Sequence, residues 1–402
     1  MAKFRTAFLG PWRAVPVLGI TQIVAWGAIY YTPVLLVPLI AAERGWSTTL
    51  TMGGFSLGIL VAGLVAPRVG GLIDHYGGHR IMPVGSLLGA VGLAGLTIVD
   101  HPAAYLAVWM VLGIAMAASL YDAAFATLGR IFGMLARRPI TALTLAGAFA
   151  STVSWPATRL LIDSIGWQGT YLVYAALLAL VAAPLHAFAL PRDHAATTPR
   201  IEDAKTAPAA VLPARGMPFL LVIAAFAIYA FVPSGLLANL LAMFERLGLG
   251  PATAVAIGAL FGPCQMVARL GEFLFARDLH PLTIARFAVG SLVVALVVLA
   301  TLGPTVAVAA AFMMLLGLCN GLMTLARGTV PLALFGTSGY GLLIGRIAGP
   351  SLVVQSAAPL IVSFIAERAS DRAAIAIAAG LAAISFACFL AIRRPQFTPR
   401  KG

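Results

Sequence analysis

Five charged residues are predicted to lie within the hydrocarbon part of stretches that are otherwise apolar: Asp122, Arg269, Glu272, Arg327 and Arg346. A charge at the centre of a bilayer costs about 2.5 to 3.5 kcal/mol on insertion scales, so such residues face protein or water and are candidates for function. Arginine offers a planar, permanently charged fork that suits a carboxylate. A buried carboxyl can take up and release a proton as its surroundings change. The residue types therefore favour anion binding, proton coupling or ion pairs at a gate.

The arginines allow two interpretations each. Arg269 lies three residues before Glu272, so the two side chains can share one helix face. Arg269 is predicted to clamp a substrate anion, and an internal ion pair with Glu272 is the alternative. Arg346 lies in a glycine-rich helix, where we expect either substrate contact or pairing at a gate.

Asp122 is the first candidate for a proton-coupling carboxyl, because burial raises a carboxyl pKa and a nearby arginine lowers it. Glu272 is the rival proton carrier. A static salt bridge between Asp122 and either Arg130 or Arg327 is the structural alternative. Arg327 lies near one end of its stretch and is expected to extend its side chain toward the membrane surface.

Uncharged polar and aromatic residues in the apolar stretches are further candidates. Gln22, Tyr30 and Asn320 are predicted to line a substrate cavity, since an amide in hydrocarbon needs hydrogen-bond partners. Further residues that could line the cavity are Trp26, Asn239 and Gln355. Tyr31 is expected to be an interfacial anchor instead.

Twelve long apolar stretches must position these residues. The chain of 402 residues is 61% hydrophobic and only 10% charged, too little polar surface for a water-soluble globule. A bilayer needs about 20 apolar residues per helix, and continuously apolar runs favour helices over barrel strands. The predicted class is an all-α integral membrane protein. The predicted spans are 14–40, 48–70, 81–99, 103–128, 139–163, 168–190, 217–243, 251–276, 281–303, 305–332, 338–365 and 372–392.

The basic residues predict the orientation of the spans. Of the 26 Lys and Arg residues, 18 lie at the termini and in the even-numbered connections, whereas 5 lie in the odd-numbered connections. Basic residues stay on the cytoplasmic side, so both termini are predicted to be cytoplasmic. The net charge of +13 follows from this asymmetry and gives no reason to expect a nucleic-acid partner.

A single long hydrophilic segment divides the chain. Residues 191–216 are rich in Pro, Ala, Thr and charge and are predicted to be a cytoplasmic linker. The predicted domains are therefore a six-helix bundle at 1–190 and a second at 217–402. The fourth span also resembles the tenth at a shift of about 200 residues, as expected for a transporter fold with parallel halves.

The connection between the second and third spans carries a recognisable motif. Residues 70–80 read GGLIDHYGGHR, which resembles the loop motif of the major facilitator superfamily. Together with the twelve spans and the linker, this resemblance covers the whole chain and implies two six-helix bundles. Gly77 and Gly78 permit a tight turn, and Asp74 can cap a neighbouring helix or pair with a basic residue. Asp74, Arg80 and Arg130 are the predicted gating residues.

A finer resemblance points to one branch of that superfamily. Its features, similar to those of oxalate/formate antiporters and monocarboxylate transporters, are Gly45-Trp46-Ser47, Arg137-Arg138, Gly166-Trp167, Met266-Val267-Ala268-Arg269 and the position of Arg346. In that branch an arginine at the position of Arg269 binds the substrate carboxylate. The chain departs from the branch in its first span, which lacks the acidic-glycine signature, and at Gln265, where the branch carries an acid.

These features together predict a secondary transporter of the bacterial inner membrane. The expected substrate is a small, monocarboxylate-like organic anion, coupled to protons or a counter-anion. The alternative is uptake of a neutral vitamin-like solute, or efflux of a drug or metalloid. An enzyme is not expected, because no HExxH motif or nucleotide-binding lysine loop occurs in the sequence. No cofactor or metal is expected, and the partners are the substrate, the coupling ion and the bilayer, around a monomer.

Overall fold

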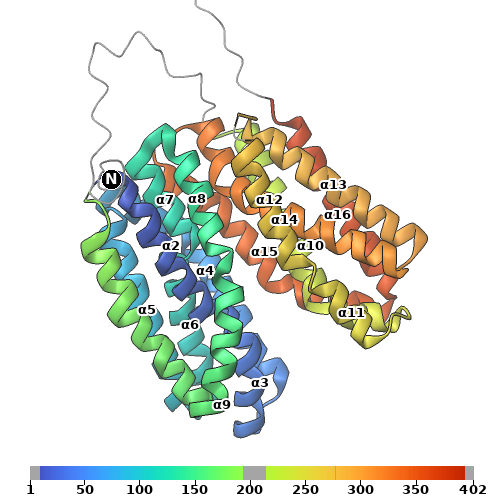
Figure 1. Cartoon of the computed structure of the whole chain (residues 1–402), viewed down its shortest axis with the longest axis horizontal. Helices are drawn as coiled ribbons and strands as arrows, with labels where there is room; N and C mark the ends of the chain where they lie inside the picture. The colour runs from blue at the N-terminus through green and yellow to red at the C-terminus, as the bar shows by residue number, and fades with distance from the viewer. Residues whose placement is uncertain (1–9, 193–213, 277, 394–402) are drawn as a thin grey trace, which may run out of the picture. The chain divides into compact units, whose positions relative to one another are not determined.

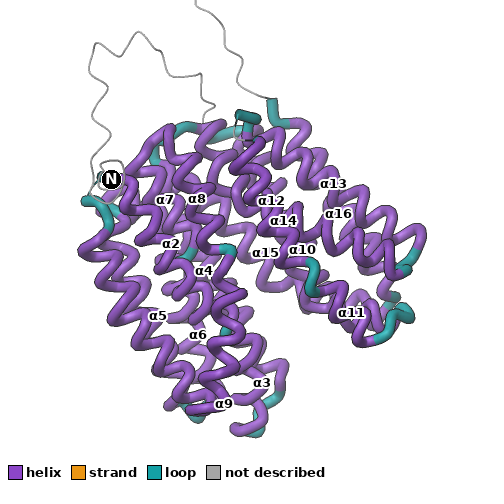
Figure 2. Tube along the Cα trace, viewed as in Figure 1, coloured by secondary structure: helices purple, strands orange, loops and turns teal. Residues whose placement is uncertain are grey.

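Helices make up all the regular structure in the part of the chain that the structure describes. The computed structural model describes residues 10–192, 214–276 and 278–393. Short loops join successive helices, as Figure 2 shows. The predicted all-α class is therefore confirmed.

Figure 1 labels the α-helices of the two halves. The elements of the first half also include three short π-helical segments, η2, η4 and η5, and two short 3-10 segments, η1 and η3. In chain order they are η1 (Pro11–Arg13), α2 (Ala14–Ala25), η2 (Trp26–Tyr31), α3 (Pro33–Arg44), α4 (Thr48–Tyr76), α5 (Gly78–Ile98), α6 (Pro102–Ser119), α7 (Tyr121–Phe132), η3 (Gly133–Ala136), α8 (Arg137–Gly147), α9 (Phe149–Leu177), η4 (Leu178–Ala182) and η5 (Leu185–Ala189). The second half continues with α10 (Met217–Arg246), α11 (Pro251–Gly258), α12 (Phe261–Phe275), α13 (Pro281–Leu302), α14 (Val306–Phe335), α15 (Tyr340–Arg368) and α16 (Asp371–Ala391).

Among the described residues, ten helical segments are long and apolar enough to cross a membrane. One of them, Pro102–Ala189, has 88 residues. At 1.5 Å per residue it is several times longer than the ~30 Å of hydrocarbon, so it must cross more than once. The backbone leaves the helical conformation within it at Leu120, Gly133 and Gly166. Gly133 and Gly166 separate the fourth, fifth and sixth predicted spans, so the twelve-span fold is confirmed.

Glycines and polar caps explain where helices begin and end. Gly77 separates α4 from α5 with φ +83°, a left-handed conformation that glycine adopts without a steric penalty. The turn predicted from the motif is thus present. Ser47, Thr305 and Ser370 each accept a hydrogen bond from a backbone N–H in the first turn of α4, α14 and α16.

The chain forms two compact units. Unit 1 comprises residues 1–197 together with 339–349, and unit 2 comprises 198–338 together with 350–402. In unit 1, α6 packs against α4 and α5, and the buried core includes Trp109, Tyr105 and Tyr171. In unit 2, α14 packs against α12 and α13, and α16 packs against α10 and α13. Most of the predicted linker, residues 193–213, lies outside the described residues.

Candidate functional site

Asp74 joins the end of α4 to the beginning of α15 inside unit 1. Its carboxylate accepts hydrogen bonds from the backbone N–H groups of Gly341 at 2.8 Å and Leu342 at 2.7 Å. A carboxylate at a helix N-terminus satisfies free N–H groups and interacts favourably with the helix dipole. The Asp74 carbonyl accepts a hydrogen bond from Arg130 of α7. Asp74 therefore caps a helix, as its motif predicts, whereas Arg80 is exposed in the first turn of α5.

Next to this cap, α4 and the first turns of α15 touch through their backbones. A Cβ atom added to Gly70 would overlap the carbonyl group of Gly341, and one added to Gly345 would overlap the carbonyl oxygen of Ala66. Small residues four apart allow such an approach between helices in a membrane. The glycine-rich helix around residue 345 therefore packs closely against α4, and we call this contact the α4–α15 seam.

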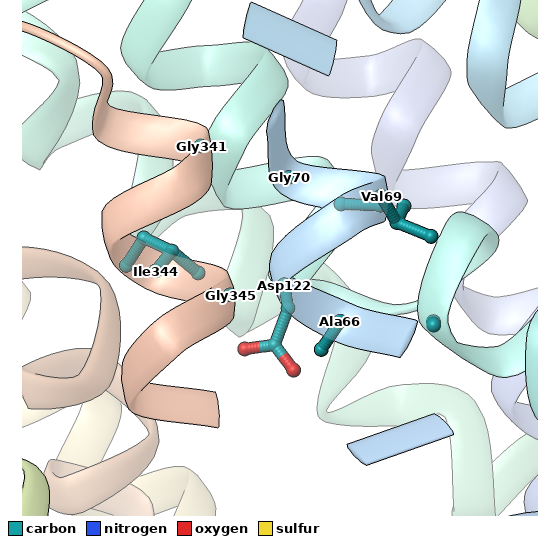
Figure 3. Close-up of a pocket in the computed structure, with 9 residues that line it drawn as sticks. Ala66, Val69, Gly70, Asp122, Gly341, Ile344 and Gly345 are labelled. Carbon is teal, nitrogen blue, oxygen red and sulfur yellow. The ribbon is translucent and has the colours of Figure 1, made fainter. Parts of the chain in front are cut away.

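Asp122 lies in a pocket beside the α4–α15 seam. The pocket lies within unit 1 and is lined by Ala66, Val69, Gly70, Ala117, Asp122, Ala123, Gly341, Ile344 and Gly345 (Figure 3). Its cavity volume of about 10 Å³ is close to the ~10 to 15 Å³ that one water needs and far below the ~300 Å³ at which small-molecule sites begin. The carboxylate thus faces a small space with apolar walls, which suits a proton or a water better than a solute. Arg346 follows Gly345 of the pocket wall and is exposed.

Arg269 lies on α12 in unit 2, next to residues that orient its guanidinium group. Its Nη2 donates to Gln265 Oε1 at 3.1 Å and to Thr324 Oγ1 at 3.4 Å. Both contacts are with neutral groups, and they orient the guanidinium group. Arg269 and Glu272 are each only 5% exposed. A solute reaches this guanidinium only after neighbouring side chains or helices move.

The other polar residues of unit 2 connect α10 to its neighbours. Tyr229 donates from its hydroxyl to Asn320 Oδ1 of α14 at 3.2 Å. Asn239 donates to the backbone carbonyls of Gly235 and Pro359, which ties α10 to α15. Asn320 is half-buried, as a residue at a cavity wall would be. The amide of Asn239, by contrast, serves helix packing.

Aromatic rings from four spans meet in unit 1. The ring cluster consists of Trp26, Tyr30 and Tyr31 of η2, Phe55 of α4, Tyr121 of α7 and Trp155 of α9. The Trp26 ring centroid lies 4.8 Å from that of Tyr30 and 5.0 Å from that of Tyr121. Tyr31, expected to be an interfacial anchor, contacts Trp155 in the same cluster, with centroids 6.3 Å apart. The six rings form a continuous aromatic surface.

Gln22 lies in the protein interior and not at the wall of a substrate cavity, where it was predicted to lie. Its side chain is fully buried, so it does not line a cavity. Its amide nitrogen donates to the Ser119 carbonyl at 2.7 Å, and its amide oxygen accepts from Trp26 Nε1 at 3.1 Å. A buried amide needs partners, and here the protein supplies them. Gln22 therefore orients the Trp26 indole.

Sequence reasoning missed Phe55, Tyr121 and Trp155, which belong to the ring cluster, and Thr324, which contacts Arg269. One signal was present in the sequence. Trp26 lies near the middle of the 34-residue helical segment Pro11–Arg44, whereas Trp and Tyr usually mark the ends of membrane spans.

Comparisons with known proteins agree on the fold. The sequence model of the Major Facilitator Superfamily matches residues 18–326. The human organic anion transporter MFSD10 (TETRAN) is similar in structure, with a TM-score of 0.72, 17% identity and coverage of 94% of this chain and 99% of that chain. The proton:xylose symporter XylE gives a TM-score of 0.73 at 10% identity, covering 95% and 96%. FucP in its outward conformation gives 0.70 at 14% identity, covering 94% and 98%. No curated protein sequence matches the chain.

Proposed function

We propose that this chain, which belongs to the major facilitator superfamily of membrane transporters, is a secondary transporter that carries a small organic anion across a bacterial inner membrane. In such folds two helical bundles rock around a central site and expose it to each side in turn. The superfamily accounts for the transport step, and the charged residues inside the spans suggest the substrate class.

The arrangement around Arg269 is the observation that carries the anion proposal. Its hydrogen bonds to Gln265 and Thr324 orient the guanidinium fork, whose planar geometry suits a carboxylate. The same side chain is nearly buried, where a charge-assisted contact is stronger than at a surface.

Asp122 and Asp74 are the proposed coupling and gating residues. Asp122 faces the pocket beside the α4–α15 seam, so its protonation changes the charge next to the helix contact that Asp74 caps. A proton taken up there is expected to shift the balance between closed and open states of the seam. Arg130, which holds the Asp74 carbonyl, is proposed to support the same gate.

A neutral or amphipathic solute is the second candidate, and the ring cluster of unit 1 favours it. Aromatic surfaces bind apolar solutes without regard to charge. Under this alternative, Arg269 serves structure only, paired with Glu272.

Transport by purified protein in liposomes tests the proposal. Arg269→Lys keeps the charge but not the fork, so uptake of a carboxylate is expected to fall about tenfold or more. Arg286→Lys is a matched control, because the Arg286 guanidinium donates to the backbone carbonyls of Phe389, Leu390 and Ile392 at the end of α16, away from Arg269 in the chain. Recovery of transport in the pair Arg269→Ala and Glu272→Gln would assign Arg269 to a structural ion pair and remove the support for an anion.

A further inference from the structure

The ring cluster of unit 1 has no part in the proposed anion binding at Arg269, in coupling or in gating. We propose that it is a stacking surface for a ring of the transported solute, so that the substrate is an aromatic or similarly flat carboxylic acid. The carboxylate part of this statement rests on the proposed function. The ring part rests on the position, rigidity and charge of the cluster alone.

The depth of the rings distinguishes them from a membrane-interface belt. Trp26 lies near the middle of Pro11–Arg44, and Tyr121 begins α7, eleven residues before the end of that helix at Phe132. Interfacial Trp and Tyr residues lie at the ends of spans, where their polar groups reach the headgroups. At mid-span, side chains that combine an apolar ring with an N–H or O–H group are expected to face protein or a polar cavity rather than lipid.

The cluster is held in place before any solute binds. The Trp26 indole N–H is fixed by Gln22, whose amide is itself fixed by the Ser119 carbonyl. The π-helical turn η2 sets Trp26, Tyr30 and Tyr31 side by side, and π-helical turns occur frequently at functional sites. A surface whose side chains are already ordered loses little conformational entropy on binding.

The exposed parts of the rings leave room for another ring. Trp26, Tyr30, Tyr31 and Tyr121 are each half-buried, and Trp155 is 49% exposed. Most pairs in the cluster meet edge to face, an arrangement that an added ring can extend. The core rings of the same unit, such as Trp109, are fully buried and offer no such surface.

The cluster recognises a ring rather than a charge. Its members are uncharged. Asp122, which follows Tyr121 in the chain, lines the pocket beside the α4–α15 seam. Tyr121, by contrast, contacts Trp26 and stacks on Phe125. The sequence neighbours Tyr121 and Asp122 thus serve different surfaces. Ring faces attract cations as well as other rings, but the proposed solute carries a carboxylate, so an aromatic or flat apolar group is the part of it expected to lie on the rings.

Matched acids test this inference. Binding and uptake are compared for benzoate and cyclohexanecarboxylate, which share the carboxylate and the six-membered ring size but not the aromatic face, with propionate and benzyl alcohol as further probes. We expect benzoate to bind about tenfold more tightly than cyclohexanecarboxylate, the ratio that about 1.4 kcal/mol of stacking gives.

Substitutions in the cluster locate the effect. Trp26→Leu and Tyr31→Leu are each expected to bring the ratio of the two affinities to within about twofold, through loss of benzoate binding and not through gain of the saturated acid. Trp26→Phe keeps a ring and should keep most of the ratio. Trp12→Leu is the control, because Trp12 is 45% exposed and contacts Phe132 outside the cluster. Its ratio should equal that of the unmodified protein.

The outcomes separate the two proposals. If benzoate and cyclohexanecarboxylate bind and move equally well, ring recognition is overturned while the anion proposal stands. If benzyl alcohol binds as tightly as benzoate and loses affinity in Trp26→Leu, the ring surface stands and the anion proposal fails. If propionate is carried but no aromatic compound binds, ring recognition is overturned. An unchanged ratio in both Trp26→Leu and Tyr31→Leu would likewise overturn it.

Discussion

Spans that correspond in chain order carry different chemistry in the two units. The first span of unit 1 carries Trp26 and Tyr30 in the ring cluster, whereas its counterpart in unit 2, α10, carries Asn239, which bonds to backbone carbonyls. The second span contributes the ring of Phe55, whereas the eighth contributes the guanidinium of Arg269. At these positions unit 1 thus carries aromatic rings, whereas unit 2 carries an amide and a buried arginine.

This difference shows which parts of a repeated helical scaffold are constrained. Packing fixes the size and polarity of residues between helices, because interiors are close-packed. The remaining faces are free to diverge after duplication. If the ring cluster of unit 1 and the region around Arg269 in unit 2 have separate functions, then selectivity for a ring, selectivity for a charge and gating should each change with different substitutions. The predictions below separate them.

The largest effect is expected at the α4–α15 seam in unit 1. Gly70→Ala places a Cβ against the carbonyl group of Gly341, and backbone atoms cannot move aside as a side chain can. The helix-propensity gain of about 1 kcal/mol from Gly to Ala is too small to offset an overlap of two backbones. We expect transport to be abolished, as measured by uptake into liposomes.

Gly71 offers the matched control for this substitution. A Cβ at Gly71 would lie 3.9 Å from Leu342 Cδ1, an ordinary contact, so Gly71→Ala should transport like the unmodified protein. Equal activity of the two alanine variants would mean that the seam does not form during transport. Substrate affinity in detergent should remain measurable in Gly70→Ala, because the seam is separate from the ring cluster.

Asp74→Asn should give the next largest effect, on turnover rather than affinity. Asparagine keeps one acceptor oxygen but turns an NH2 group toward a backbone N–H, so one of the contacts to Gly341 and Leu342 is lost. A charge-assisted contact of about 1.5 to 3 kcal/mol corresponds to a change of about tenfold or more in a rate or equilibrium. Flux and binding are measured separately, and lost affinity with normal turnover would contradict a gating role.

A smaller and more selective change is expected at Gln265 in unit 2. Gln265→Glu keeps the shape of the partner of Arg269 but adds a negative charge beside the guanidinium. We expect affinity for carboxylates to fall about tenfold, with the ratio between aromatic and saturated acids unchanged. Gln265→Met, which removes the hydrogen bond without adding charge, should lower affinity less. A loss of ring selectivity in Gln265→Glu would show that the two units do not divide recognition in this way.

The sequence predicts the architecture better than the site. Apolar stretches of bilayer length and the linker composition lead to twelve helices, because these features follow from local sequence and a fixed hydrocarbon thickness. The cap at Asp74 was expected only from the resemblance of its motif to a known family, since the N–H groups of Gly341 and Leu342 lie 267 and 268 residues away in the chain. The role of Gln22 could not be predicted in the same way. Its acceptor, the Ser119 carbonyl, lies 97 residues away in the chain and belongs to another span.

The ring cluster was hidden for a related reason. Its members lie on four spans, and whether Tyr121 meets Trp26 depends on how those spans are rotated about their axes. The π-helical turn at Trp26–Tyr31 changes the rotation of the first span about its axis, and no residue type in WGAIYY indicates such a turn. The spacing of apolar residues along a span indicates which face of the helix is apolar. It does not indicate which other ring each aromatic side chain contacts.

Arginines in the odd-numbered connections, which are predicted to lie on the side opposite the cytoplasm, provide a second comparison between the units. In unit 1, the Arg44 guanidinium lies 5.1 Å from the Trp46 ring centroid and 5.2 Å from that of Trp167. In unit 2, Arg246 at the end of α10 makes a bidentate pair with Asp371, at 2.9 and 2.7 Å. Both charges are compensated locally, by aromatic faces in one unit and by a carboxylate in the other.

Replacement of each arginine by lysine should affect the two units differently, and this is the smallest effect. The Arg44 side chain is 8% exposed, and an ammonium cannot stack flat between two rings, so Arg44→Lys should cost about 1 to 2 kcal/mol at any salt concentration. The Arg246 side chain is 52% exposed, so Arg246→Lys should cost about 0.5 to 1 kcal/mol, less as salt screens the pair. Thermal unfolding midpoints in detergent at low and high salt measure both. The contrary result would be a shift of the unfolding midpoint in Arg44→Lys that decreases with salt, as the shift in Arg246→Lys does. Arg44 would then be held by its contact with Asp100 at 3.8 Å, and not by the aromatic rings of unit 1.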